Sequence, residues 1–323
     1  MKKLNSYSIW IGLVVLFIIV YLIADRLLFD GVKPRGINES GIQANYFAKN
    51  TTKQKATIIL IGGGQWGDYW GRQFAEIGFS GLSLPYTGKE GLPTLPEEIN
   101  LEYFENALNW LKQQPEVDSS KIVLMGASRN AELALLIASL FPERVHGVIA
   151  YAPSAVLWSN TVLPYNSNDL KASWKYKDLD LPYIPMEKIS GNESNKIETL
   201  TYWKRGLAKT EYLNQATIQV EKITGPILLF SGKDDKVWPS SIMADMIEER
   251  IKKSNYSYAF QNIQYENAGH LISGNPGSKS TVRTGKINIA EKDYEFEFGG
   301  TIEGDDKAQL DAKTRLTLFI QNL

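Results

Sequence analysis

One serine of the chain directly follows a short apolar segment that is expected to be a strand. The segment Lys121–Met125 leads into Gly126-Ala127-Ser128-Arg129-Asn130, and the apolar stretch Ala131–Phe141 predicts a buried helix after it. This strand–turn–helix order is typical of a nucleophile elbow, where a strained turn exposes the serine hydroxyl at the edge of a sheet. The usual pattern is G-x-S-x-G. Because Asn130 replaces the second glycine, slightly wider packing between helix and strand is expected. Ser128 is the candidate nucleophile.

A carboxylate that could serve this serine follows a later strand-like segment, Ile227–Phe230. The loop after it contains Asp234 and Asp235 and ends at Pro239. We choose Asp235, since its spacing from the flanking glycine and proline is the one at which hydrolases of this fold carry their acid. The alternative is that both aspartates only form a turn and cap the next helix.

An imidazole completes the constellation. His270 comes after the next plausible strand and gives the chain order Ser, Asp, His. A neutral imidazole can accept the serine proton and return it to the leaving group, while a carboxylate fixes its tautomer. The chain has two histidines, and the other, His146, lies inside the predicted strand Val145–Tyr151, where a packed structural side chain is expected.

A glycine-rich loop, Gly62–Gly67, directly follows the predicted strand Thr57–Ile61. Such a loop can supply one backbone N–H group to an oxyanion, here from Gly64 or Gln65, and the residue after the nucleophile, Arg129, can supply the other. The loop is not interpreted as a dinucleotide-binding motif, because no acidic residue ends a second strand about 20 positions later. A phosphate-binding P-loop is also excluded, since no Gly-Lys-Ser/Thr follows.

The composition limits the available chemistry. Among 323 residues there is no cysteine, which excludes disulfides, iron–sulfur clusters, thiolate zinc sites and a cysteine nucleophile. Two histidines are too few for most imidazole-bound metal centres. The 35 basic and 36 acidic side chains nearly balance, which argues against a nucleic-acid partner. We therefore expect no metal and no cofactor.

Short apolar segments alternate with helical patterns along most of the chain, which is typical of an α/β fold with a mostly parallel sheet covered by helices on both faces. Residues from about 154 to 215 lack strand alternation and are rich in tryptophan and tyrosine. We interpret them as an inserted lid within a catalytic domain that covers residues 43–323. Its aromatic side chains are expected mainly to pack, with substrate contact as the alternative.

The N-terminal segment is strongly apolar. Ile9–Ala24 contains no charged residue, and Lys2 and Lys3 precede it. This pattern predicts a membrane anchor over residues 1–28 and a tether over residues 29–42, with the lysines cytoplasmic and the catalytic domain of a single-pass protein outside the cytoplasm. A cleaved signal peptide and a buried helix are the alternatives.

Several stretches resemble one branch of the α/β-hydrolases, the acyl-CoA thioesterase / bile acid-CoA:amino acid N-acyltransferase family, in its C-terminal catalytic domain. The resemblance covers roughly residues 43–323. The stretches that carry it are Leu82–Leu111, Lys121–Ser139, Ser231–Ser240, Ala268–Leu271 and Gly299–Ile320.

The resemblance implies a triad carried by Ser128, Asp235 and His270. A serine nucleophile is similar to the thioesterase members, whereas acyl transfer to amino acids is associated with cysteine. The chain departs from the family at Asn130, in place of a glycine, and it shows no N-terminal β-sandwich domain between Asp25 and Gln43. A site outside the cytoplasm would also not meet coenzyme A, which is cytosolic.

Three functions are consistent with these features. The first is a serine hydrolase that cleaves an acyl ester or thioester through an acyl-enzyme. The second is an acyltransferase that passes the acyl group to an amine or alcohol. The third is a membrane-tethered binding module without activity, which only Asn130 favours. No pattern in the chain indicates an oligomeric state.

Overall fold

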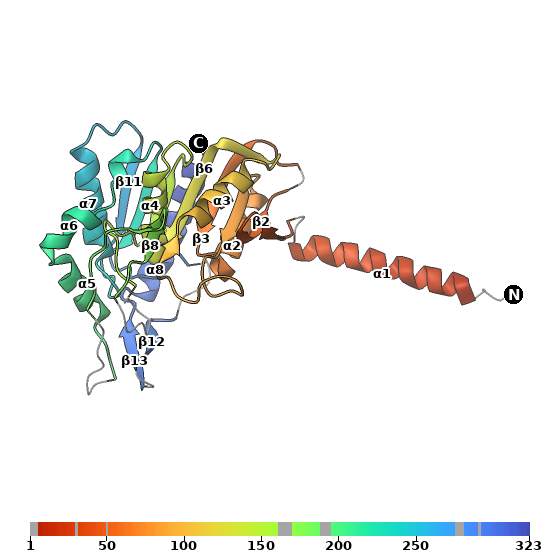
Figure 1. The fold of residues 1–323 in the computed structure, drawn as a ribbon. Helices are drawn as coiled ribbons and strands as arrows, with labels where there is room; N and C mark the ends of the chain where they lie inside the picture. Colours follow the sequence, from red (N-terminus) through yellow and green to blue (C-terminus); the bar gives the residue numbers. More distant parts are fainter. Residues whose placement is uncertain are drawn as a thin grey trace.

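An eight-stranded, mostly parallel sheet forms the centre of the computed structural model (Figure 1). The structure describes residues 6–29, 32–49, 51–160, 170–187, 195–274, 281–289 and 292–323. The strand order is β1-β2-β4-β3-β6-β7-β10-β11. β1 and β2 join the sheet antiparallel, and the remaining strands run parallel to one another. The strands of this sheet are β1 (Arg35–Glu39), β2 (Ile42–Phe47), β3 (Lys55–Ile61), β4 (Ser80–Leu84), β6 (Val117–Ala127), β7 (Val148–Tyr151), β10 (Ile227–Gly232) and β11 (Phe260–Tyr265).

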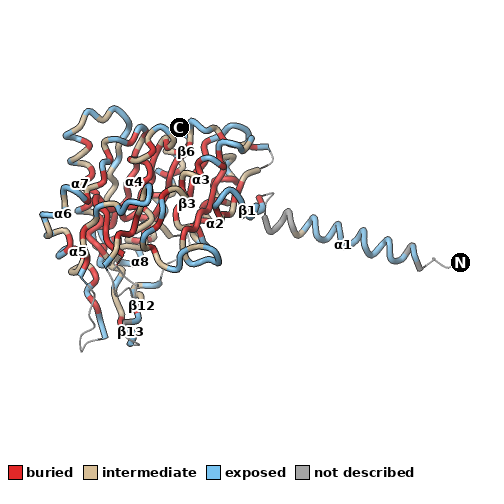
Figure 2. Tube along the Cα trace, viewed as in Figure 1, coloured by how far each residue is buried: buried red, intermediate tan, exposed pale blue. Residues whose placement is uncertain are grey.

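Helices cover both faces of the sheet, because the buried strands present apolar side chains alternately to each side. Ile59 and Leu124 belong to the core that includes α3 (Glu102–Leu111), α4 (Arg129–Leu140) and α7 (Ser240–Lys252). Ile58 and Val123 belong to the core that includes α2 (Gly64–Glu76) and α8 (Ile302–Gln321). Figure 2 shows the buried strands between the partly exposed helices. This arrangement agrees with the predicted α/β architecture.

The predicted lid, residues 154–215, lies between β7 and β10, and its positions 161–169 and 188–194 fall outside the described residues. Hereafter its described part is called the insertion. It contains β8 (Trp174–Tyr176), β9 (Leu179–Asp180), α5 (Thr199–Leu207) and most of α6 (Thr210–Ala216). β8 also pairs with β5 (Ile99–Asn100), and the 3-10 helix η1 (Val220–Lys222) precedes β10. The insertion is therefore tied to the α/β core by a small second sheet.

The N-terminal helix α1 (Ser6–Phe29) projects from the α/β domain (Figure 1), and Ile9–Ile23 carries mostly exposed apolar side chains. Nevertheless, no helix within the described part of the chain has both the length and the apolar character that crossing a bilayer requires. The predicted membrane helix is therefore wrong, and so are the predicted membrane partner and single-pass location.

Two further segments form strands. The stretch predicted as a tether, residues 29–42, contains β1, which forms the edge of the main sheet. Beyond His270, β12 (Thr284–Ile289) and β13 (Lys292–Glu297) form an antiparallel hairpin. This hairpin reaches the insertion through a bridge between Lys196 and Glu295.

Candidate active site

Ser128 occupies the sharp turn between β6 and α4. Its backbone has φ 59° and ψ −126°, a conformation that residues with a side chain rarely adopt. The turn is held by main-chain bonds, from Ser128 N–H to the Tyr151 carbonyl and from Ala131 N–H to the Ser128 carbonyl. Gly126 is required because a Cβ there would lie 2.1 Å from the carbonyl oxygen of Asn130. The local sequence thus produces the strained turn that G-x-S suggested.

The structure brings the three predicted polar side chains into one hydrogen-bonded row. Ser128 Oγ lies 3.0 Å from His270 Nε2, and His270 Nδ1 lies 2.9 Å from Asp235 Oδ2. The imidazole is 10% exposed and the carboxylate 2%. A hydroxyl, an imidazole and a buried carboxylate in this order can move a proton from the serine while charge develops on the ring.

Asp235 is fixed by donors on both of its carboxylate oxygens. Its Oδ1 accepts hydrogen bonds from the backbone N–H groups of Val237 and Trp238, and Oδ2 accepts one from Ser240 Oγ at 2.7 Å. Asp234 behaves differently, since it pairs with Lys236 and accepts the Gly300 N–H on a partly exposed surface. The turn-forming role that we considered for both aspartates therefore fits Asp234.

His146 lies at the opposite edge of the sheet, before β7, where its backbone N–H binds the Ile122 carbonyl. Burial lowers the pKa of its imidazole, with a smaller opposing effect of Asp118. Within the described residues its Nδ1 is buried without a hydrogen-bond partner. This placement is structural and far from the row formed by Ser128, His270 and Asp235.

Two helix N-termini supply the backbone N–H groups expected to bind an oxyanion. In the glycine loop, the N–H groups of Gly62 and Gly63 already bind the carbonyls of Leu84 and Leu60. Gly64 and Gln65 begin α2, and Arg129 begins α4. The first N–H groups of a helix have no acceptor inside it, so these three remain the candidate donors.

Asn130, which departs from the family pattern, lies in the first turn of α4 opposite Gly62. A Cβ on Gly62 would lie 2.3 Å from Asn130 Nδ2, so the glycine leaves the space that the amide fills. Tyr86 donates a hydrogen bond of 2.8 Å to Asn130 Oδ1. The larger residue is thus accommodated by a glycine distant in sequence, a complementarity that neither motif reveals alone.

A buried ion pair supports the histidine loop, and sequence reasoning missed it. Asp305, at the start of α8, is fully buried; it accepts the Gly269 N–H at 2.7 Å and pairs with Arg283 at 2.5 Å. Arg283 also donates to the Gly299 carbonyl, and His270 N–H donates to the Phe298 carbonyl. The acidic pair Asp305-Asp306 was a visible signal, but an acidic helix start is ordinarily read as a cap.

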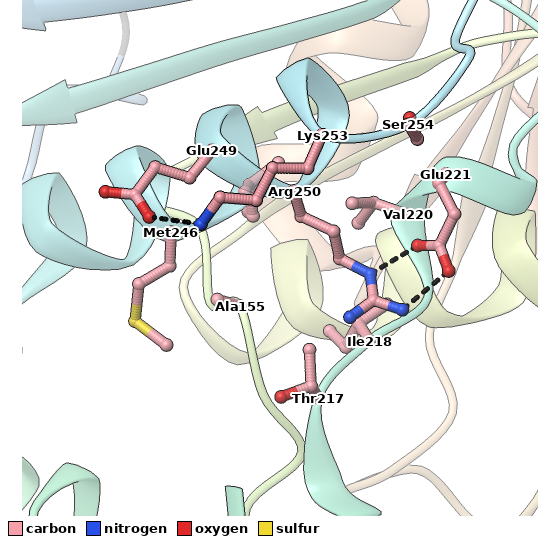
Figure 3. A pocket seen from close by; sticks show the side chains of 11 residues that line it. Ala155, Thr217, Ile218, Val220, Glu221, Met246, Glu249, Arg250, Lys253 and Ser254 are labelled. Carbon is pink, nitrogen blue, oxygen red and sulfur yellow. Dashed lines mark hydrogen bonds and ion pairs between the residues drawn. The ribbon is translucent and has the colours of Figure 1, made fainter. Parts of the chain in front are cut away.

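A well-formed cavity lies away from this row. A cavity of about 440 Å³ lies beside α7. Its lining includes the apolar residues Ile218 and Met246 and the pairs Arg250–Glu221 and Lys253–Glu249 (Figure 3). None of the three predicted catalytic side chains lines it. Its cations are already neutralised, so we assign it no part in the chemistry.

Comparisons with known proteins were consistent at three levels. A family model described as "BAAT / Acyl-CoA thioester hydrolase C terminal" matches residues 99–323. Acyl-coenzyme A thioesterase 6 of Mus musculus is 28% identical over 298 residues, which cover 92% of this chain and 66% of that protein. Acyl-coenzyme A amino acid N-acyltransferase 2 of Mus musculus is 28% identical over 247 residues, 75% of this chain and 55% of that protein.

A solved structure, a dienelactone hydrolase-like promiscuous phosphotriesterase from metagenomic libraries, superposes with a TM-score of 0.52 at 14% identity and covers 91% of this chain and 99% of its own. At that identity the likeness shows the α/β-hydrolase fold. The chain spans less than two thirds of the length of the two curated relatives named above.

Proposed function

The chain belongs to the BAAT / acyl-CoA thioester hydrolase C-terminal family, and from that premise we propose that it is a serine hydrolase of acyl thioesters or esters. The observation that carries the proposal is the hydrogen-bonded row from Ser128 through His270 to Asp235, with contacts of 3.0 and 2.9 Å. The family's printed description and that of the mouse thioesterase favour a thioester as the substrate.

In the proposed acylation step, His270 Nε2 takes the proton of Ser128 Oγ as that oxygen bonds to the acyl carbon. The carbonyl oxygen becomes an oxyanion, which the N–H groups of Arg129 and of Gly64 or Gln65 stabilise. The bond from carbon to sulfur, or to the ester oxygen, then breaks. The leaving group receives the proton from His270, and an acyl-serine remains.

Deacylation repeats the sequence with water. His270 accepts a water proton while the water oxygen attacks the acyl carbon, and the proton then returns to Ser128 Oγ as the acid leaves. Throughout, Asp235 keeps Nδ1 of the ring protonated, so that Nε2 is the basic nitrogen. The hydrogen bonds from Val237, Trp238 and Ser240 hold the Asp235 carboxylate in place for this role.

Acyl transfer to an amine is a second candidate, favoured by the 28% identity to the mouse N-acyltransferase. Water and an amine would attack the same acyl-serine, so the two functions differ only in the acceptor. Measuring how one acyl thioester partitions between free acid and conjugate, with an amino acid added as the acceptor, separates them. Conjugate formation above the uncatalysed rate would favour transfer.

The test of the hydrolase uses the full chain with a fluorophosphonate probe and a series of acyl-CoA thioesters and p-nitrophenyl esters. We expect labelling at Ser128 and hydrolysis of at least one substrate, and we expect both to be lost in Ser128→Ala while the thermal midpoint is kept. Ser139→Ala, a change on α4 outside the site, is the matched control. If Ser128 is not labelled and no substrate is cleaved, the binding-module alternative replaces the enzyme.

A further inference from the structure

A second carboxylate, which the proposed mechanism does not use, belongs to Glu132, one helical turn after Ser128. Glu132 is in the first turn of α4 and is fully buried. Burial raises the pKa of its carboxyl group, and the nearby Arg129 guanidinium is the largest opposing effect. Arg129 Nη1 lies 2.5 Å from Glu132 Oε2, so the residue after the proposed nucleophile holds this carboxylate as an ion pair.

The remaining partners of this pair all come from the insertion. Glu132 Oε1 accepts the Trp174 indole N–H at 2.8 Å and the Trp158 backbone N–H at 3.2 Å. Arg129 Nη2 donates to Ser173 Oγ at 2.5 Å and to the Trp158 carbonyl at 3.4 Å. The guanidinium carbon also lies 5.4 Å from the centre of the Trp174 ring. The ion pair therefore connects α4, the helix after the proposed nucleophile, to the insertion.

Burying both charges would be unfavourable in free energy if the ion pair served only to stabilise the fold. A buried ion pair often stabilises a fold no more than apolar residues of the same size would, because both charges lose their hydration. Here one further donor, Arg129 Nε, is buried without an acceptor among the described residues. What the pair does fix is the Arg129 side chain, which Glu132 holds on one side and the insertion on the other. The backbone N–H of the same residue is a proposed oxyanion donor.

We infer that Arg129 and Glu132 are positioning residues that couple docking of the insertion to the alignment of the oxyanion-binding N–H group. This inference rests on the proposed hydrolase function. When the insertion is seated, Trp158, Ser173 and Trp174 complete the coordination of both charges, and α4 begins in the geometry that the transition state requires. When it is not, the pair loses its partners and the donor is misaligned.

The test compares four variants of the full chain. Glu132→Gln keeps an acceptor for both tryptophan N–H groups but removes the charge that holds Arg129. Arg129→Gln and the double variant test coupling between the two charges. Glu105→Gln is the matched control, because it removes another partly buried arginine–glutamate pair, with Arg144 at 3.2 Å. Among the described residues, the Arg144 side chain binds Glu105 and Asn109 of α3. The readouts are kcat and KM for a short p-nitrophenyl ester, the rate of fluorophosphonate labelling and the thermal midpoint.

We expect Glu132→Gln to lower kcat about 10- to 100-fold, less than or comparable to loss of one oxyanion donor, with KM nearly unchanged. The labelling rate should fall in parallel, since it reports the same serine chemistry. The double variant should be more active than Glu132→Gln alone, because it leaves no unpaired buried charge. Glu105→Gln should keep kcat within about twofold of the wild type.

Three outcomes decide the matter. Suppose that Glu132→Gln lowers the thermal midpoint but is labelled and turns over substrate at the wild-type rate. The ion pair then only stabilises the fold and the inference is wrong, while the hydrolase function stands. If wild-type Ser128 is never labelled, the proposed function itself fails. If Glu132→Gln does not fold, Ser173→Ala removes one acceptor of Arg129, and an unchanged kcat in that variant also overturns the inference.

Discussion

The two sides of the candidate active site are built in different ways. Ser128 is held by main-chain bonds, both within the turn from β6 into α4 and to Tyr151 of the adjacent strand β7. His270 instead lies in a loop after β11 whose position depends on Asp235, on Phe298 and on the buried Asp305. The serine side is therefore determined locally, whereas the histidine side is assembled from segments far apart in the sequence.

This difference predicts which property, activity or stability, a substitution on each side reduces. Changes on the serine side should remove chemistry without disturbing the fold, since the backbone alone shapes the turn. Changes on the histidine side should disturb activity and stability together, because the side chains that aim the imidazole are also those that hold the loop. The following predictions test that contrast, beginning with the largest effect.

Removing the imidazole should abolish turnover as completely as removing the serine hydroxyl. We expect His270→Ala to lower kcat by about 10⁴-fold or more, and the double variant with Ser128→Ala to be no worse than either single variant, because the two groups act as one unit. Steady-state kinetics with one thioester measure this. Multiplicative losses would show that the two side chains act independently.

Asp235→Asn should cost about 10³- to 10⁴-fold in kcat, because an amide in that place favours the wrong imidazole tautomer. Asp234→Asn is the matched control, since its side chain pairs with exposed Lys236 and does not reach the imidazole. Its kcat should stay near that of the wild type. Equal losses in the two variants would contradict our assignment of the acid.

Asp305→Asn should lower kcat roughly 10-fold and destabilise the fold by about 1–3 kcal/mol, because it leaves Arg283 without its buried charge partner. Activity and chemical denaturation are measured on the same preparation. Glu303→Gln on the same helix breaks an exposed pair with Lys307 and should leave the free energy of unfolding nearly unchanged. A loss of activity without a loss of stability would break the contrast between the two sides.

The smallest effect concerns the strained turn itself. Ser128→Gly should raise the free energy of unfolding by about 1 kcal/mol relative to Ser128→Ala, because glycine adopts a positive φ without strain. Both variants lack the nucleophile, so chemical denaturation compares them without any difference in chemistry. Equal stabilities would mean that the turn stores no strain.

The local parts of the site were predictable because their signals are local. The apolar segments ending at Met125 and Phe230 are the inner parts of β6 and β10, and each delivers its polar residue at the same edge of the sheet. The order Ser, Asp, His also identified the three side chains that the structure places in contact. Their catalytic roles stay a prediction until the variants are measured.

The prediction of a membrane helix was wrong for a related reason. Hydrophobicity over a short window is a local signal, but spanning a bilayer depends on the total apolar length of a helix. The run Ile9–Ala24 satisfied the first condition, whereas no helix among the described residues satisfies the second. The apolar residues of this run were therefore not sufficient to predict a helix that crosses a membrane.

What the sequence by itself determined is the succession of strands, turns and helices, and with it the strained turn at Ser128, because backbone sterics and apolar periodicity act between near neighbours. What only the tertiary structure decided is which distant groups complete the site. Gly62 makes room for Asn130, Asp305 holds the loop of His270, and Glu132 and Arg129 meet the insertion. Burial creates those partnerships, since a charge or amide removed from water must find its hydrogen bonds wherever the folded chain provides them.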